Sequence, residues 1–305
     1  MDEQPKSLFQ RPLWVSIFAL TAAVVWGWAY PLIKLGMREF AITTDMTASK
    51  MLFAGIRFTL SGLIVLAIAR PTRRSYAVAR PKDWTFIIAY SLVNTTLHYA
   101  FFYLGLSHSE GSRAAIINSA SVFTTVILAC MIFKSDHFTL RKITGCMVGF
   151  AGIVLLNVGG GDSGAFTLMG DGMIMANALC GSCASLLTRG LGRRVDVFVG
   201  TGYSLAIGGA LLTIPGLIMG GCLPHITPQG ITYLTLLIGI STIGFTLYNK
   251  LLTCNPVGKV AIYNSLIPVV GAITSCMCLG ETFYTKYILA TILAATGIYV
   301  INKGK

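Results

Sequence analysis

Ten apolar runs, each long enough to cross a bilayer, constrain the fold of this chain more than any other feature. A helix rises about 1.5 Å per residue, so about 20 residues are needed to cross the hydrocarbon core. Runs bounded by charges, prolines or glycines predict spans at 13–35, 50–70, 83–106, 112–133, 140–158, 168–190, 197–220, 229–252, 258–279 and 284–302. We therefore expect an all-α polytopic membrane protein with ten transmembrane helices.

The composition agrees with a membrane protein and excludes a sizeable soluble domain. Of the 305 residues, 54% are hydrophobic and 11% are charged, and the mean hydropathy is +0.73. These values are typical of a chain that exposes apolar side chains to lipid. The first run is about as long as a full span and lacks a small-residue cleavage site, so we do not expect a cleaved signal peptide.

The net charge of +12 reflects membrane topology. With the N-terminus inside, 17 of the 23 Lys and Arg residues fall on cytoplasmic segments. Five fall outside and one, Arg57, lies within the second span. The positive-inside rule therefore places both termini in the cytoplasm. Because the basic charge is explained by topology, we expect no nucleic-acid partner.

An internal repeat divides the chain into two halves of five spans. The segment SRAAIINS (112–119) aligns with GKVAIYNS (258–265) at an offset of 146, and Asp136 aligns with Glu281 at an offset of 145. Since five is odd, the halves must have opposite orientations, which is the inverted-repeat plan of secondary transporters. The predicted divisions are a cytoplasmic tail (1–12), a first repeat (13–158), an extracellular linker (159–167), a second repeat (168–302) and a cytoplasmic tail (303–305).

Several stretches resemble the drug/metabolite transporter (DMT) superfamily and, within it, EamA-type transporters. The matching stretches are VVWGWAYPLIK (24–34), AGIRFTLSG (54–62), GSRAAIINSASVF (111–123), FTLRKITGCMVGFAGIVLL (138–156), GDGMIMANALCGSCASLLTR (170–189), VGKVAIYNSLIPVVGAI (257–273) and LGETFYTKYILATILAATGIYVI (279–301). The resemblance implies ten helices, a central cavity that faces alternate sides, and export of small metabolites, amino acids or drugs. The chain departs from the pattern at Val122, where the second half has Pro268.

The first span carries three candidate cavity residues, Trp26, Tyr30 and Lys34. Trp26 and Tyr30 are four residues apart and can share one helical face, which leaves Trp28 for lipid. Lys34, near the outer end, either extends to the lipid headgroups or faces the outer mouth of the cavity. The sequence alone leaves both alternatives for Lys34 open.

Arg57 lies seven residues inside the second predicted helix, about 10 Å below the interface. A charge at that depth on a lipid-facing surface costs at least about 2.5 kcal/mol, so we expect Arg57 to face the interior and to have partners. By the same counting Lys34, His98 and Asn118 lie in the outer third. One hypothesis is a site there for an anionic group such as a carboxylate, and the other is a gating or structural role for Arg57.

Other polar residues within the spans complete the candidate list. Asn94 and His98 are four residues apart, which predicts a shared face. Asn118 and Asn264 occupy matching positions in the two repeats. Tyr248 and Asn249 lie in the cytoplasmic half of the eighth span. Each of these side chains either contacts the substrate or serves as an interhelical hydrogen-bond partner.

The acidic residues limit the possible functions. All eleven fall outside or at the rims of the predicted spans, so no acid is placed to carry a proton across the membrane. We expect facilitated diffusion with His98 as a neutral hydrogen-bond partner, and a proton carrier or a packing residue are the alternatives for His98. No catalytic triad, phosphate-binding loop or metal-ligand cluster is visible in the sequence, so an intramembrane enzyme is disfavoured and no cofactor is expected.

The favoured function is therefore a secondary transporter of small organic solutes, and the alternative within the superfamily is a phosphate-exchanging antiporter for sugar phosphates or nucleotide sugars. That antiporter would need several basic residues at mid-depth, and only Arg57 comes close. The expected partners are a small-molecule substrate and the lipid bilayer. The matching small-residue faces Gly145-x-x-x-Gly149 and Ala290-x-x-x-Ala294 suit packing within a monomer or a homodimer contact. Short loops suit a bacterial inner membrane.

Overall fold

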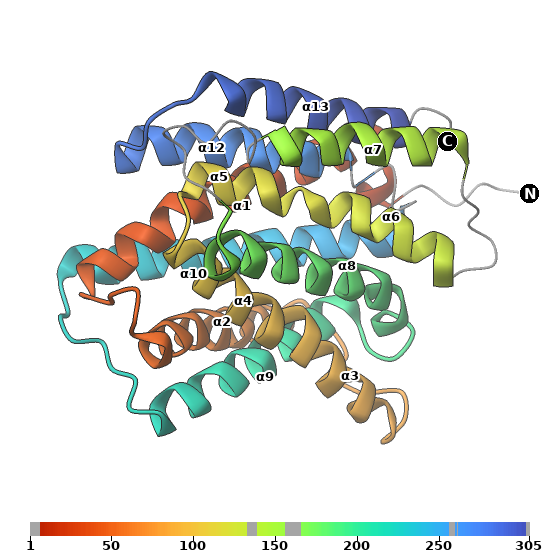
Figure 1. Ribbon diagram of the computed structural model, residues 1–305. Coiled ribbons are helices and arrows are strands. Elements are labelled where there is room, and N and C mark those ends of the chain that lie inside the picture. The colour runs from red at the N-terminus through yellow and green to blue at the C-terminus, as the bar shows by residue number, and fades with distance from the viewer. Residues whose placement is uncertain (1–6, 133–138, 156–165, 256–259, 261, 303–305) are drawn as a thin grey trace, which may run out of the picture.

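The computed structural model describes residues 7–132, 139–155, 166–255, 260 and 262–302 (Figure 1). After the short helix η1 (Leu8–Gln10), the first half contains α1 (Pro12–Glu39), α2 (Thr47–Ala69), α3 (Asp83–Ser91), the π-helix η2 (Leu92–Leu97), α4 (His98–Ser107), α5 (Gly111–Asn118), α6 (Ala120–Ile132) and α7 (Leu140–Leu155). The second half contains the π-helix η3 (Leu168–Gly172), α8 (Met173–Leu191), α9 (Val197–Ile218), α10 (Pro228–Cys254), η4 (Ile262–Ser265), α12 (Leu266–Leu279) and α13 (Thr285–Asn302).

Several of these elements join end to end, so that the described residues form ten helical spans and no strand. The chain runs without a break through α3, η2 and α4, through η3 and α8, and through η4 and α12, and a single residue separates α5 from α6. The predicted fold class is thereby confirmed. The helices that are long and apolar enough to cross a membrane as single elements are Pro12–Glu39, Thr47–Ala69, Gly111–Ile132, Val197–Ile218 and Pro228–Cys254.

Corresponding helices of the two halves pack against each other in antiparallel pairs. On α2, a methyl group at Gly55 would lie 2.5 Å from the backbone nitrogen of Thr213, and one at Gly62 would lie 2.2 Å from that of Ala206. From Gly55 to Gly62 the residue number rises along α2, whereas the contacted residue on α9 changes from Thr213 to Ala206. The two helices therefore run in opposite directions. Their backbones approach closely because both helices present glycine at the seam.

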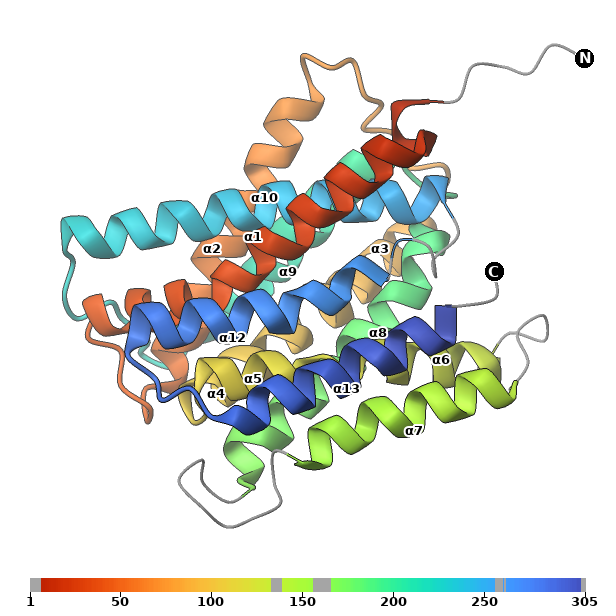
Figure 2. The ribbon, with the colours of Figure 1, turned by 90° about the horizontal axis from the view of Figure 1, so that it is seen from above.

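The pair α7 and α13 repeats this arrangement at the opposite side of the bundle (Figures 1 and 2). Gly152 contacts Ala290 and Ala294, whereas Gly297 contacts Gly145 and Gly149. The two helices are again antiparallel, as an inverted repeat requires.

The first helix of each half packs against helices of the other half. Helix α1 packs against α10 and α12, and its counterpart α8 packs against α4 and α6. Helix α1 is 28 residues long and continues through Pro31.

We name the two ends of the bundle by their residues. The Glu281 end holds the connections 40–46, 108–110, 219–227 and 280–284, and the Arg74 end holds the connections 70–82 and 192–196.

Candidate substrate site

Arg57 lies in the interior of the bundle, where it joins the two halves. Its side chain on α2 is 1% exposed. Nε donates to Ser241 Oγ at 2.8 Å and to the Leu237 carbonyl at 3.2 Å, both on α10, and Nη1 donates to the Tyr103 hydroxyl on α4 at 3.1 Å. Among the described residues no carboxylate lies within ion-pair distance of Arg57. A full positive charge is therefore held by neutral oxygens.

Aromatic rings surround this charge. The Arg57 Cζ atom lies 4.7 Å from the ring centroid of Phe58 and 5.9 Å from that of Tyr99. The negative face of each ring favours a cation, which partly replaces the lost hydration. Phe102 and Phe245 extend the group, with centroids 5.9 and 6.1 Å from that of Tyr99. We call Phe58, Tyr99, Phe102 and Phe245, together with Tyr30 and Trp26, the central aromatic cluster.

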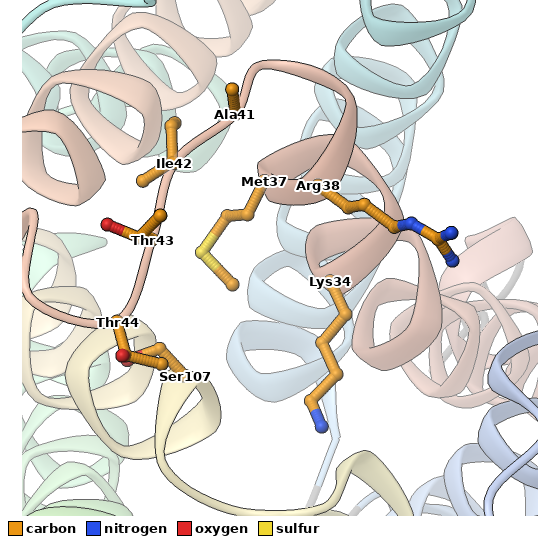
Figure 3. Close-up of a pocket in the computed structure, with 8 residues that line it drawn as sticks. All are labelled: Lys34, Met37, Arg38, Ala41, Ile42, Thr43, Thr44 and Ser107. Carbon is orange, nitrogen blue, oxygen red and sulfur yellow. The ribbon is translucent and has the colours of Figure 1, made fainter.

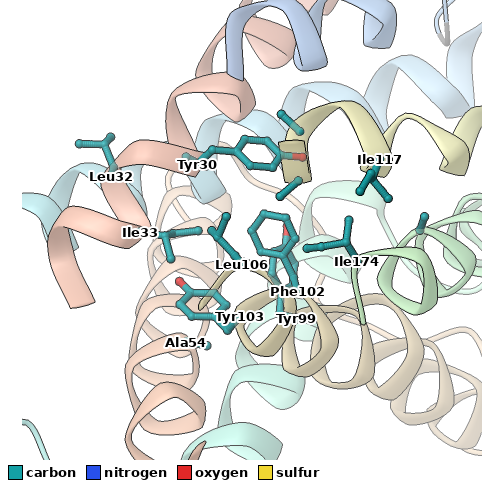
Figure 4. Close-up of a cluster of buried hydrophobic side chains, with 14 of the residues drawn as sticks. Tyr30, Leu32, Ile33, Ala54, Tyr99, Phe102, Tyr103, Leu106, Ile117 and Ile174 are labelled. Carbon is teal, nitrogen blue, oxygen red and sulfur yellow. The ribbon is translucent and has the colours of Figure 1, made fainter. Parts of the chain in front are cut away.

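Tyr30 and Asn118 belong to a polar chain at the edge of this cluster. The Tyr30 ring packs on Phe102 at 5.3 Å (Figure 4), and its hydroxyl accepts from Asn118 Nδ2 at 2.9 Å. Asn118 Oδ1 accepts in turn from Asn177 Nδ2 on α8 at 2.7 Å. The chain thus links α1, α5 and α8, and Asn177 is a member that sequence reasoning did not single out.

Trp26, Tyr248 and Asn264 lie on the other side of the cluster. The Trp26 ring contacts Phe245 at 5.4 Å and Tyr248 at 5.1 Å. The Tyr248 hydroxyl accepts from Asn264 Nδ2 at 2.7 Å. Trp28, by contrast, is 41% exposed on the outside of the bundle, where a membrane protein meets lipid.

Asn94 and His98, which are four residues apart, contact different neighbouring helices. Asn94 Nδ2 donates to Ser204 Oγ on α9 at 3.1 Å. His98 instead packs against Gly181 on α8, and its ring lies 4.6 Å from that of Tyr99. Asn94 lies within the π-helix η2, which ends directly before His98. His98 therefore joins the central aromatic cluster and Asn94 does not.

Asn249 also lies away from the cluster. Its Nδ2 donates to Thr201 Oγ1 on α9 at 2.9 Å, and the residue is 3% exposed. Asn94 and Asn249 thus both bind hydroxyls of α9, from opposite halves of the chain. These contacts are those of interhelical hydrogen-bond partners.

Lys34 lies at the Glu281 end, beside a cavity of about 410 Å³ (Figure 3). The cavity is lined by Lys34, Met37, Arg38, Ser107 and the turn 41–44. Lys34 Nζ forms an ion pair with Glu281 Oε1 at 3.1 Å, and its side chain is 25% exposed. Lys34 is therefore neutralised by a carboxylate of the other half and does not join Arg57.

A second ion pair at this end is fully enclosed. Arg113 at the start of α5 binds Asp171 on η3, directly before α8, through Nε at 2.9 Å and Nη2 at 2.7 Å. The two side chains are 4% and 3% exposed. Sequence reasoning placed Asp171 at a helix rim and assigned it no role, because nothing local in the chain indicates its partner 58 residues away.

Seven of the ten candidate residues are joined through the central aromatic cluster. They are Trp26, Tyr30, Arg57, His98, Asn118, Tyr248 and Asn264. The cluster combines a buried cation, apolar ring faces and amide and hydroxyl groups from both halves. Such a surface suits a small organic molecule with an apolar body and an anionic group.

Comparison with known proteins agrees with this architecture. A model of the EamA-like transporter family matches residues 13–158 and 168–303, which is most of the chain. The chain belongs to the EamA-like transporter family. Its place in the drug/metabolite transporter superfamily is thereby confirmed, and as a member of a family of transporters it is not an enzyme.

Several curated proteins are similar to this chain along nearly their whole length. The uncharacterized transporter YvbV of Bacillus subtilis (strain 168) is 23% identical over 92% of this chain and 88% of its own. Two proteins named "probable amino-acid metabolite efflux pump" are 25% identical (Salmonella typhimurium strain LT2) and 24% identical (Escherichia coli strain K12). Each covers 92% or 93% of both chains. One crystal structure superposes with a TM-score of 0.68 over 94% of this EamA-like chain and 95% of its own, at 17% identity, which shows the shared fold.

Proposed function

We propose that this protein is a secondary transporter that exports small organic metabolites, amino acids among them, by alternating access. Residues 13–158 and 168–302 act as the two repeats, joined by the segment 159–167, of which 159–165 lie outside the described residues. In inverted-repeat transporters the substrate site lies between the halves near the middle of the membrane. The two similar proteins named as amino-acid metabolite efflux pumps support this choice of substrate and of direction.

The observation that carries the proposal is the unpaired charge of Arg57 between the two halves. A buried cation without a carboxylate partner attracts anions and repels cations through a medium of low dielectric constant. The substrate is accordingly an organic carboxylate, either an anion or a zwitterion. Its apolar body packs on the rings of the central aromatic cluster, and permanently cationic drugs are excluded.

The phosphate-exchanging antiporter requires basic residues that converge on one site. In this structure Lys34 binds Glu281 and Arg113 binds Asp171, both at the Glu281 end. Neither the ammonium group of Lys34 nor the guanidinium group of Arg113 reaches Arg57. A doubly charged phosphate monoester would therefore meet a single cation, and the organic carboxylate is the better match.

The orientation follows from charge. The basic segments 70–82 and 192–196 lie at the Arg74 end, so this end and both termini face the cytoplasm and the Glu281 end faces outward. We place the protein in a bacterial inner membrane, as a monomer or a homodimer.

Transport is uncoupled in this proposal, because no described carboxylate joins the central aromatic cluster and His98 acts there as a neutral hydrogen-bond partner. The test is uptake of labelled amino acids and organic acids into proteoliposomes, with and without an imposed pH gradient, for the wild type and His98→Gln. The proposal predicts equilibration of the solute without accumulation. Accumulation that is driven by the pH gradient and lost in His98→Gln would contradict uncoupled transport, and absence of any transported carboxylate would contradict the function itself.

A further inference from the structure

The Glu281 carboxylate lies in a group of hydrogen-bond donors at the start of α5. Oε1 accepts from the backbone nitrogen of Gly111 at 2.8 Å and from Lys34 Nζ at 3.1 Å. Oε2 accepts from the backbone nitrogen of Ser112 at 3.0 Å and from its hydroxyl at 2.8 Å. N-terminal amides of a helix, a hydroxyl and an ammonium group together bind carboxylates in general, so the donors are not specific to Glu281.

A further hydroxyl beside these donors has no partner. Ser275 on α12 is completely buried, and its Oγ makes no hydrogen bond among the described residues. A methyl group on Gly111 would lie 2.6 Å from this oxygen, so the Ser275 hydroxyl adjoins the first amide of the site. A buried hydroxyl that forms no bond costs free energy, and an anion at this position would accept from it.

The neighbouring charged groups are engaged with other partners. Glu110 accepts a hydrogen bond from the Tyr287 hydroxyl, and Arg113 binds Asp171. Lys34 is the cation that forms an ion pair with the carboxylate bound by the donors of α5. Lys34 also lines the cavity of about 410 Å³.

The carboxylate and most of its donors belong to different halves of the chain. Glu281 lies between α12 and α13, whereas Lys34, Gly111 and Ser112 lie on α1 and α5. A movement of one half relative to the other would therefore separate the carboxylate from these donors. In this conformation Glu281 occupies the donors as an anion that is covalently attached to the other half.

We propose that Lys34, the amides of Gly111 and Ser112 and the hydroxyls of Ser112 and Ser275 form a second carboxylate-binding site, on the release side of the transporter. Glu281 occupies the site in this conformation, and the carboxylate of the exported solute occupies it when Glu281 withdraws. This inference rests on the proposed function, because it takes the solute to be an organic carboxylate and the Glu281 end to be the outer one.

The test is chemical rescue of the purified full-length protein by acetate. Glu281→Ala removes the tethered carboxylate, and we expect a lower unfolding temperature that sodium acetate restores in a saturable way. Sodium chloride at the same ionic strength and the neutral isostere acetamide should restore nothing. The wild type should not respond to acetate. In Glu281→Ala/Lys34→Ala the affinity for acetate should fall by about tenfold or more, since a charge-assisted bond is lost.

A matched control is Asp196→Ala at the opposite end of the bundle. Asp196 also caps a helix, accepting from the nitrogens of Phe198 at 2.9 Å and Val199 at 3.4 Å, and pairs with Arg74 at 3.4 Å. Its side chain is 24% exposed, compared with 9% for Glu281. Equal rescue of both variants would mean a general effect of acetate on helix ends and would overturn the proposal.

Glu281→Ser provides a second variant, with a small polar side chain that vacates the site, if Glu281→Ala does not fold. Acetate should stabilise Glu281→Ser and leave the wild type unchanged, and the absence of any acetate effect in Glu281→Ser would overturn the proposal. The measurement is independent of transport. If the protein exports carboxylates but acetate rescues neither variant, the proposed function stands and the second site is contradicted. If acetate rescues the variants but no carboxylate is transported, both the release-side role and the proposed function are contradicted.

Discussion

Arg113 on α5 and Asp171 on η3 form a bidentate ion pair that is buried inside the bundle, with donor to acceptor distances of 2.9 and 2.7 Å. The pair joins the fourth span of the first half to the first span of the second half. Asp171 also accepts from the Thr167 backbone nitrogen at 3.3 Å and from the Ser109 hydroxyl at 3.4 Å. The carboxylate of Asp171 is thus also bound by residues that directly precede both helices.

Breaking this pair should strongly destabilise the protein. Removal of one partner from a buried ion pair leaves an uncompensated charge, which typically costs about 3–5 kcal/mol. We predict that Asp171→Ala and Arg113→Ala each lower the unfolding temperature in detergent. The unfolding temperature of the double variant should fall by less than the sum of the two single decreases, because neither charge is then left unpaired. Additive losses would contradict direct coupling of the two side chains.

The seam between α2 and α9 predicts a steric effect of a single methyl group. A Cβ atom at Gly62 would lie 2.2 Å from the Ala206 nitrogen, and neither backbone can move without disturbing a helix. Gly62→Ala should therefore lower the unfolding temperature, by an amount that corresponds to about 1–3 kcal/mol or more.

Gly239 on α10 is the matched control for this prediction. A Cβ atom there would meet nothing within 4 Å. Gly239→Ala should leave stability unchanged or raise it slightly, because alanine favours the helix by about 1 kcal/mol over glycine. Equal effects of the two substitutions would argue against close packing of α2 on α9.

The Glu281 site predicts a dependence of stability on pH. Burial of the carboxylate acts to raise its pKa, but Lys34 and the amides of Ser112 and Gly111 together outweigh it, and the pKa of Glu281 lies below its usual value of 4.5. A lowered pKa in the folded state adds stability that is fully present above pH 4.5 and is lost as the pH falls through the folded-state pKa.

Comparison of the wild type with Glu281→Gln isolates this contribution. The difference in unfolding temperature should be constant near neutral pH and should shrink once the pH falls below 4.5. Glu110, Asp171 and Lys34 face the same region and are present in both proteins, so the comparison isolates the change at position 281. A difference that stays constant down to pH 3, or that grows in acid, would contradict the sign of the shift.

Much of the fold could be predicted from the sequence because a bilayer leaves few alternatives. Lipid offers no hydrogen bonds, so every long apolar run must form a helix, and hydropathy then places the spans. The same reasoning predicted that Arg57 is internal, since a charge on the lipid-facing surface is costly. The inverted repeat was visible because Asn118 and Asn264 lie in matching motifs.

The details of the site depended on contacts that no local pattern encodes. Asn94 contacts α9 and His98 contacts α8, and their spacing of four residues gives no signal of these different partners. Glu281 and Asp171 seemed to be rim acids, because the partners that bury them come from the other half of the chain. Asp136, the predicted counterpart of Glu281, lies outside the described residues.

Arg57 carries the central claim, that the protein moves organic carboxylates past a buried unpaired cation. The most direct measurement is counterflow of a labelled carboxylate solute in proteoliposomes of the wild type, Arg57→Lys and Arg57→Ala. Loss of a charged hydrogen-bond donor is worth about 1.5–3 kcal/mol, so Arg57→Ala should slow transport by about tenfold to a hundredfold. Arg57→Lys keeps the charge without the planar fork and should be impaired less. Wild-type rates in both variants, with protein levels matched, would contradict the account.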